Sequence, residues 1–127
     1  MKAYLAIKYH KDGRNHGLIR EICEVLRALE IETIAPVIHL ETDGKKLEPK
    51  ELMQKSLAEL RTCDILIAEC SEKSVGLGIE AGYAFSIAKP IILIAKEGSE
   101  VSPTLLGIAE KIIFYNNPAE LSRKIRW

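Results

Sequence analysis

Residues 71–84, with the sequence SEKSVGLGIEAGYA, place a serine, glycines and a glutamate at the expected start of a helix. Ser74 offers a hydroxyl, and Gly76 and Gly78 let the backbone approach a ligand closely. The free N–H groups of a helix start attract an anion such as a phosphate or a carboxylate. This stretch therefore predicts an anion-binding site.

Glu80 falls on the side of this helix that the apolar pattern turns inward. That side is expected to comprise Ile79, Tyr83, Ala84 and Ile87. A buried carboxylate costs several kcal/mol unless it is neutralised, hydrogen-bonded or open to a pocket. A pocket explains both the glutamate and the glycines. A structural role, in which a first-turn glutamate favours the helix dipole, stays open.

The elements that position these residues alternate between apolar strands and helices. The expected strands cover residues 3–9, 31–38, 63–70, 90–95 and 111–115. The expected helices cover residues 16–30, 50–61, 76–88, 103–108 and 118–127. Apolar strands separated by helices are typical of a parallel sheet covered on both faces. The sequence thus predicts a single α/β domain over residues 1–127, with a doubly wound, mainly parallel five-stranded sheet of the Rossmann or flavodoxin-like kind.

The position of a site in such a sheet follows from its topology. Ligands bind beyond the carboxyl ends of the strands, where the strand order reverses. The loops at residues 8–15, 70–78 and 96–103 are therefore the expected walls of the site. The longer loop at residues 39–49 is expected to be a flap or a surface excursion rather than a domain boundary.

The composition narrows the class of ligand. Among 127 residues, 18 basic side chains balance 18 acidic ones, which argues against a long nucleic acid or a membrane surface as the partner. No apolar stretch approaches the roughly 20 residues that span a bilayer. Three cysteines without a CxxC pair are typical of a reducing compartment, so a cytoplasmic location is expected. A small molecule is the expected ligand.

Several catalytic and cofactor motifs are missing from the sequence. There is no GxxxxGK[ST] phosphate loop, and the glycines at 76, 78 and 82 are spaced GxGxxxG instead of GxGxxG. A GxSxG nucleophile elbow is missing as well. The histidines at 10, 16 and 39 lack partners at metal-ligand spacing. Neither a metal nor another cofactor is expected.

The run CDILIAECSEKSVGLGIEAGYAFSIAKPIILI, residues 63–94, resembles the nucleoside 2-deoxyribosyltransferase superfamily. The pattern of that superfamily is an apolar strand ending in an acidic residue, a loop, then S-x-G-x-(G)-x-E-x-G-x-A, and a KP before the next strand. The sequence looks closest to the small branch of 2'-deoxynucleoside 5'-phosphate N-hydrolases, and its length and element order agree with that branch.

The resemblance implies a role for each matching residue. Glu80 matches the glutamate that acts as nucleophile at the anomeric carbon of the sugar. Ser74, Gly76 and Gly78 match positions that help to hold the 5'-phosphate. Tyr4 matches a first-strand tyrosine that lies beside the catalytic carboxylate.

The resemblance also implies a homodimer, because small relatives complete each site with a serine from the neighbouring subunit. Ser102 matches that serine only when a gap is allowed. An adjacent carboxylate can stabilise the charge that develops on the sugar during N-glycosidic cleavage, or trap the sugar as an ester. The leaving base departs more easily when a second acid protonates it.

The sequence departs from the family where that second acid is expected. Ser56 stands at the position of an aspartate on the helix before the third strand, although it shares the inward side of that helix with Leu52, Leu57 and Leu60. Asp12, in the first loop, is a candidate replacement for the missing acid.

The first loop departs from the family as well. Ile7, Lys8 and His10 replace the Gly-Ser pair and the arginine of the hydrolase branch. Lys8, His10 or Arg14 could supply the positive charge that a phosphate needs.

The leading hypothesis is hydrolysis of the N-glycosidic bond of ribo- or deoxyribonucleoside 5'-monophosphates, with Glu80 as nucleophile. Transfer of deoxyribose between bases is an alternative, distinguished by adding a free acceptor base. A nucleotide-binding or sensing protein without catalysis is another, motivated by Ser56, and a structural protein without a ligand is the last.

Overall fold

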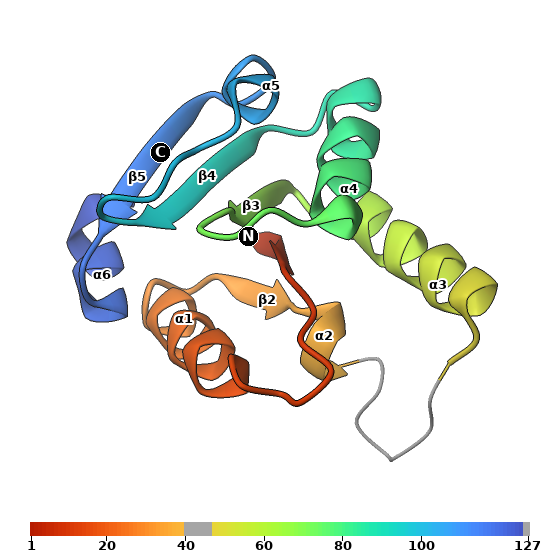
Figure 1. Cartoon of the computed structure of the whole chain (residues 1–127), viewed down its shortest axis with the longest axis horizontal. Coiled ribbons are helices and arrows are strands. Elements are labelled where there is room, and N and C mark those ends of the chain that lie inside the picture. The colour runs from red at the N-terminus through yellow and green to blue at the C-terminus, as the bar shows by residue number, and fades with distance from the viewer. Residues whose placement is uncertain (40–46, 126–127) are drawn as a thin grey trace.

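The computed structural model describes residues 1–39 and 47–125. Their strands form one parallel sheet in the order β2-β1-β3-β4-β5 (Figure 1). The strands are β1 (Lys2–Ile7), β2 (Glu32–Ile34), β3 (Ile65–Glu69), β4 (Ile91–Lys96) and β5 (Lys111–Tyr115). This is the flavodoxin-like strand order, and it confirms the predicted fold class.

Helices cover both faces of the sheet (Figure 1). One face carries α1 (His16–Ala28) together with the C-terminal η1 (Pro118–Glu120) and α6 (Leu121–Lys124). The other face carries α3 (Pro49–Thr62) and α4 (Val75–Ser86). Two short helices, α2 (Pro36–His39) and α5 (Pro103–Leu106), follow β2 and β4.

Each face of the sheet has its own hydrophobic core. In β1, Leu5 and Ile7 belong to the core under α1, whereas Tyr4 and Ala6 belong to the core under α3 and α4. Successive side chains of a strand point to opposite faces. Because both faces are covered, the strands read in the sequence as continuous apolar runs. Among the described strand residues, the buried charged one is Glu69, the last residue of β3, at 3% exposure.

The helices begin and pack as their sequences dictate. In α1, Ile19, Ile22 and Leu26 recur every three or four residues and are buried. Pro49 opens α3, a position that tolerates proline because the first N–H of a helix has no intrahelical partner. Ser74 caps α4 by accepting a hydrogen bond from the Leu77 N–H.

Two predicted boundaries need correction. The strand predicted at 31–38 ends at Ile34, and Pro36 begins α2 instead, because proline lacks the N–H of a strand ladder but suits a first helical turn. The helix predicted at 118–127 is a 3-10 turn followed by α6, which ends at Lys124. The predicted flap at 39–49 falls mainly on residues 40–46, outside the described part of the chain.

The packed face of α4 also differs from its prediction. The buried residues are Leu77, Ala81 and Ala84, whereas Ile79 is 50% exposed, so the inward placement of Ile79 was wrong. Glu80 lies at the margin of the packed face and is half-buried. Within the described residues, no helix has the length and apolarity needed to cross a membrane.

Candidate active site

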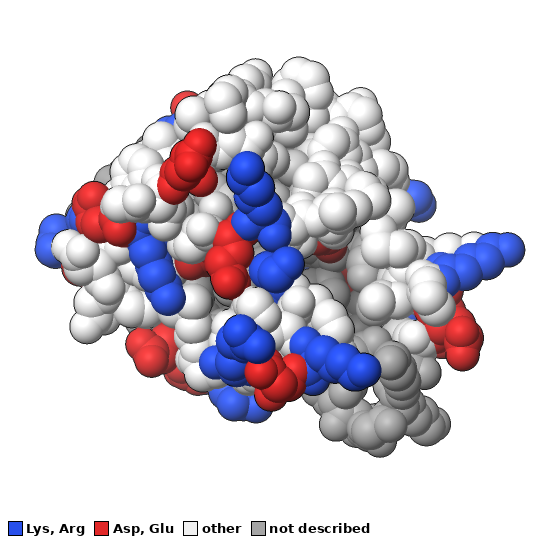
Figure 2. Space-filling view, viewed as in Figure 1, with Lys and Arg blue, Asp and Glu red and all other residues white. Residues whose placement is uncertain are grey.

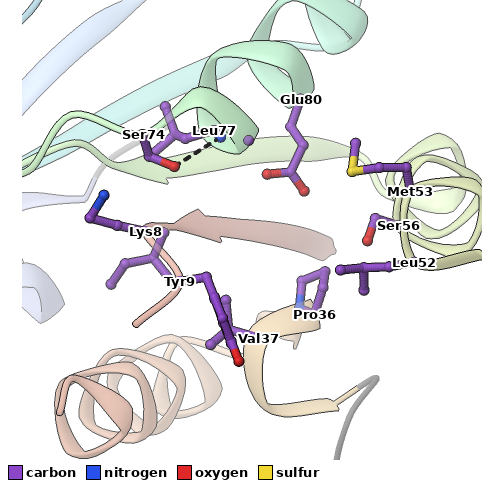
Figure 3. A pocket seen from close by; sticks show the side chains of 12 residues that line it. Lys8, Tyr9, Pro36, Val37, Leu52, Met53, Ser56, Ser74, Leu77 and Glu80 are labelled. Carbon is purple, nitrogen blue, oxygen red and sulfur yellow. Dashed lines mark hydrogen bonds between the residues drawn. The ribbon is translucent and has the colours of Figure 1, made fainter. Parts of the chain in front are cut away.

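The carboxyl ends of β1 and β3 meet where the strand order reverses, since α1 leaves β1 on one face and α4 leaves β3 on the other. A cavity of about 190 Å³ opens there, on the face of α3 and α4 (Figure 3). We call it the Glu80 cavity. Its lining residues are Ile7, Lys8, Tyr9, Pro36, Val37, Leu52, Met53, Ser56, Ser74, Gly76, Leu77 and Glu80. Doubly wound folds bind their ligands at this position.

Glu80 projects from α4 into this cavity (Figure 3). The Tyr4 hydroxyl donates a hydrogen bond to its Oε2. Burial raises the pKa of Glu80 to about 7, while the Tyr4 hydrogen bond acts in the opposite direction by stabilising the charged form. Near neutral pH both protonation states are therefore populated, which suits a carboxylate that acts as nucleophile or base.

Tyr4 and Ser56 form the floor beside Glu80. Tyr4 is fully buried, and its pKa is raised first by burial and then by the neighbouring Glu80 charge. Ser56 is 3% exposed, lines the cavity and is hydrogen-bonded to Tyr4, which opposes the rise in the tyrosine pKa. The structure thus brings Ser56, Tyr4 and Glu80 together in a chain of polar side chains.

The N-terminus of α4 forms another wall of the cavity. Ser74 and Gly76 line it, and a Cβ built on Gly76 would meet only Ser74 Oγ, at 4.0 Å. The Ser74 Oγ accepts a hydrogen bond from the Leu77 N–H at 3.3 Å (Figure 3). Gly78 is exposed and lies outside this cavity. Ser74 and Gly76, but not Gly78, therefore line the same cavity as Glu80.

A second cavity, of about 470 Å³, lies at the same edge of the sheet. We call it the His10 cavity. It is lined by Ile7, Lys8, His10, Arg14, Asn15, Leu18, Glu69, Ser71, Glu72, Lys96 and Ser99. Ile7 and Lys8 line both cavities, so the two meet at the end of β1. Of the predicted phosphate-binding cations, Lys8 reaches the Glu80 cavity, whereas His10 and Arg14 reach only the second one.

The loop after β1 is held by specific contacts. The Lys8 Nζ donates a hydrogen bond to the Lys73 carbonyl at 3.2 Å. The His10 Nε2 lies 2.6 Å from the Glu72 Oε2. Asp12 is exposed, pairs with Arg14 at 2.9 Å and does not line the Glu80 cavity. In this structure Asp12 therefore does not occupy the place of the acid that Ser56 replaces.

Ser102 lies apart from Glu80. It caps α5, accepting a hydrogen bond from the Thr104 N–H at 3.2 Å. It lines a groove of about 480 Å³ between α4 and α5, together with Ser74 and Gly78. Within one chain, Ser102 is thus separated from the Glu80 cavity by the first turn of α4.

Sequence reasoning missed the network around Glu69. This carboxylate accepts hydrogen bonds from the Ser71 N–H at 2.7 Å, the Ser71 hydroxyl at 3.0 Å and the Tyr115 hydroxyl. The Ser71 Oγ in turn accepts a hydrogen bond from the Lys96 N–H at 2.8 Å. An acidic residue inside an apolar strand was the signal that could have revealed it. The network fixes the loop that leads to Ser74.

The apolar wall opposite Glu80 was only half predicted. Leu52 was expected to point inward from its helix, and it lines the cavity together with Met53. Tyr9, Pro36 and Val37 were missed, because no pattern in the sequence indicates that a helix begins at Pro36 and turns back toward the end of β1.

Comparison with known proteins identifies the family. Residues 3–117 match the family model named nucleoside 2-deoxyribosyltransferase. The chain belongs to this family. It is therefore an enzyme of the N-glycosidase and deoxyribosyltransferase kind.

Three relatives illustrate the similarity. A protein of Thermofilum pendens, provisionally named 2'-deoxynucleoside 5'-phosphate N-hydrolase 1, is 29% identical over 98% of this chain and 92% of its own length. The 5-hydroxymethyl-dUMP N-hydrolase of Mus musculus is 34% identical over 45% of this chain and 34% of its own length. The CMP N-glycosidase BcmB of Clostridium botulinum has the same fold, with a TM-score of 0.71, 22% identity and coverage of 98% and 96% of the two chains.

Among the described residues, no group of three or more His, Cys, Asp or Glu side chains is arranged to hold a metal ion. The described part of the Glu80 cavity offers a carboxylate, hydroxyls, an ammonium group and backbone N–H groups.

Proposed function

We propose that this enzyme hydrolyses the N-glycosidic bond of nucleoside 5'-monophosphates, releasing the free base and a sugar 5-phosphate. The observation that carries the proposal is the position of Glu80. Its carboxylate faces a cavity whose neighbouring wall is the N-terminus of α4, with Ser74 and Lys8 beside it. A sugar with its anomeric carbon at Glu80 would direct its 5'-phosphate toward that wall.

Glu80 acts as the nucleophile in this proposal. The ionised Oε attacks the anomeric carbon, an ester bond forms, and the electron pair of the broken C–N bond leaves with the base. Water then hydrolyses the ester: its hydroxyl group joins the anomeric carbon, its other proton goes to the released base, and the carboxylate and the sugar phosphate are set free. Tyr4 orients the carboxylate through its hydrogen bond to Oε2.

The 5'-phosphate binds at the start of α4. The free N–H groups of the first turn and the Ser74 hydroxyl supply donors for an anion. Lys8 adds a positive charge from the end of β1. This arrangement favours a phosphorylated substrate over the corresponding nucleoside.

The base packs against the wall opposite Glu80. Tyr9, Val37, Leu52 and Met53 form an apolar surface with Pro36, which suits the flat face of a nucleobase (Figure 3). Tyr9 is 51% exposed, so its ring is free to cover a bound base.

Transfer of the sugar to another base is the alternative reaction. Both reactions pass through the same ester at Glu80 and differ only in whether water or a free base resolves it. Adding an acceptor base to the assay distinguishes them, because a new nucleotide forms only by transfer.

We further propose that the active enzyme is a homodimer in which Ser102 reaches the site of the other subunit. Val75, Ile79, Phe85 and Leu106 are exposed apolar side chains on α4 and α5. In Figure 2 the region over these two helices carries few charged side chains, whereas acidic and basic side chains lie side by side elsewhere on the same face. Analytical ultracentrifugation of the wild type and of an F85K variant tests the dimer.

The decisive test of the reaction is base release. Wild type and E80Q are incubated with ribo- and deoxyribonucleoside 5'-monophosphates and with the same nucleosides without phosphate, and free base is measured by chromatography. We expect Glu80-dependent release that is faster from the monophosphates. Equal release by wild type and E80Q would refute Glu80 as nucleophile, and no release from any nucleotide would refute the reaction.

A further inference from the structure

The His10 cavity is lined by basic side chains, which we call the cationic cluster, and by the carboxylate of Glu72. Lys8, His10 and Arg14 line it, and Lys8 also lines the Glu80 cavity, where we place the 5'-phosphate. Glu72, on the loop between β3 and α4, lies among these groups. That loop also carries Ser74, the proposed phosphate ligand.

Glu72 makes a direct contact with one of these groups. Its Oε2 lies 2.6 Å from the His10 Nε2. The His10 side chain is only 11% exposed, whereas the Glu72 side chain is 55% exposed. Glu72 thus has room to move into solvent, whereas His10 is largely enclosed by the protein.

The surrounding groups keep Glu72 in its charged form. The His10 hydrogen bond lowers the pKa of Glu72, and the positive charges of Lys8 and Arg14 lower it further. Its carboxylate therefore interacts with the same groups that would attract a phosphate. Lys8 is close by because its Nζ donates to the Lys73 carbonyl, next to Glu72 in the chain.

We propose that Glu72 is a built-in competitor of the substrate phosphate: its carboxylate occupies the cationic cluster in the free enzyme and must swing out when the phosphate binds. The inference rests on the proposed function, since it requires the 5'-phosphate bound at Ser74 to extend past Lys8, where the Glu80 cavity meets the His10 cavity. Glu72 is then a residue that sets affinity and specificity, and it takes no part in bond cleavage.

The competition has a distinct kinetic signature. Removing the Glu72 charge frees the cationic cluster before binding, so the KM for a nucleoside 5'-monophosphate falls while kcat stays nearly constant. The KM for the unphosphorylated nucleoside does not change, because nothing in it displaces Glu72. If Glu72 instead held His10 in a productive position, the same change would raise the KM for the monophosphate.

The test compares E72Q with the wild type at low salt, where charge interactions are screened least. Gln retains the size of the side chain and its capacity to hydrogen-bond to His10. The matched control is E97Q, which removes the same charge from an exposed residue that lines neither cavity. Inorganic phosphate is the probe in calorimetry, and KM and kcat are measured for a nucleoside 5'-monophosphate and for the nucleoside.

We expect E72Q to bind inorganic phosphate about fivefold to tenfold more tightly than the wild type, the net scale of one ordinary hydrogen bond, with E97Q nearly unchanged. A double-mutant cycle with H10A sharpens the result, because the gain should largely disappear when His10 is absent. Equal or weaker phosphate binding by E72Q, or an equal gain in E97Q, would overturn the inference. Phosphate binding requires no turnover, so failure of the proposed reaction would appear separately, as no base release by the wild type.

Discussion

Two glutamates lie at the carboxyl edge of the sheet, and each accepts a hydrogen bond from a buried tyrosine. Tyr4 of β1 donates to Glu80 on the face of α3 and α4, whereas Tyr115 of β5 donates to Glu69 on the face of α1. The pairs resemble each other in composition and lie on opposite sides of the same sheet. Their remaining contacts are what differ.

Glu69 accepts two further hydrogen bonds from Ser71, so both of its oxygens are occupied. Within the described residues, Tyr4 is the only hydrogen-bond donor to Glu80, and the carboxylate faces a cavity. Burial without enough donors raises the pKa of Glu80 to about 7. A carboxylate with its acceptors filled stabilises a loop, and one that keeps a free oxygen toward a cavity can react.

The largest expected effect separates the two glutamates by activity. We expect E80Q to lower kcat/KM by about 10³-fold or more, because it removes the proposed nucleophile. E69Q should lower kcat/KM only severalfold, since it acts through the position of the Ser71–Ser74 loop. Circular dichroism checks that both variants are folded. Equal losses of kcat/KM in the two folded variants would mean that the comparison between the two glutamates is wrong.

The second effect concerns stability as a function of pH. The pKa of Glu80 is raised from its ordinary value of 4.5 to about 7, so folding favours its neutral form. The stability that this neutral form contributes is fully present below about pH 4.5 and is lost as the pH rises through 7. Residue 80 carries no charge at any pH in E80Q. As the pH rises from about 4.5 to 7, the free energy of unfolding of E80Q should therefore increase by on the order of 3 kcal/mol relative to that of the wild type. Urea unfolding of both proteins at several pH values measures this gain, and parallel pH curves would contradict it.

The third effect is the loss of stability when the hydrogen bonds of Glu69 are disturbed. E69Q replaces one acceptor oxygen by an NH2 group that faces donors, so the Tyr115 hydroxyl or the Ser71 N–H loses its partner. We expect a loss of about 1 to 3 kcal/mol in the free energy of unfolding at neutral pH. Glu59→Gln, at a partly exposed position on α3, serves as the control and should cost less than half of that. An E69Q variant as stable as the wild type would show that the hydrogen bonds of Glu69 do not hold the loop.

Much of this difference was beyond prediction from the sequence. Apolar strands separated by helices predicted the sheet, and the inward position of Glu80 beside glycines predicted the pocket. The sequence could not reveal that Tyr115 and Glu69 meet, because they lie 46 residues apart and the strand order brings them together. It also could not reveal that Glu72 reaches His10, since both lie in loops without a periodic pattern.

The fourth effect concerns the pH profile of the reaction. With ionised Glu80 as nucleophile, kcat/KM should fall about tenfold per pH unit well below a midpoint near 7. Tyr4→Phe removes the donor that stabilises the charged form, so its midpoint should move upward. The substrate phosphate titrates identically in both assays, so the difference between the two profiles isolates Glu80. An unchanged or lower midpoint in Y4F would contradict this role of Tyr4.

The smallest expected effect belongs to the cap of α4. Ser74→Ala removes the side-chain acceptor for the Leu77 N–H and should destabilise the protein by about 1 kcal/mol. It should also raise the KM for nucleoside monophosphates, but not for nucleosides. Ser86→Ala, at the exposed end of the same helix, is the control for any general effect on α4. An equal rise in both KM values would place the phosphate elsewhere.

The most direct test of the central claim is to trap the sugar on Glu80. A nucleoside 5'-monophosphate with fluorine at C2' destabilises the positive charge that develops on the sugar and so slows hydrolysis of the ester. Wild-type enzyme mixed with this analogue and quenched should gain the mass of one fluorinated sugar phosphate, on the peptide that contains Glu80, and E80Q should gain none. Base release by the wild type with no mass gain at any time, or with the sugar on another residue, would contradict Glu80 as the nucleophile.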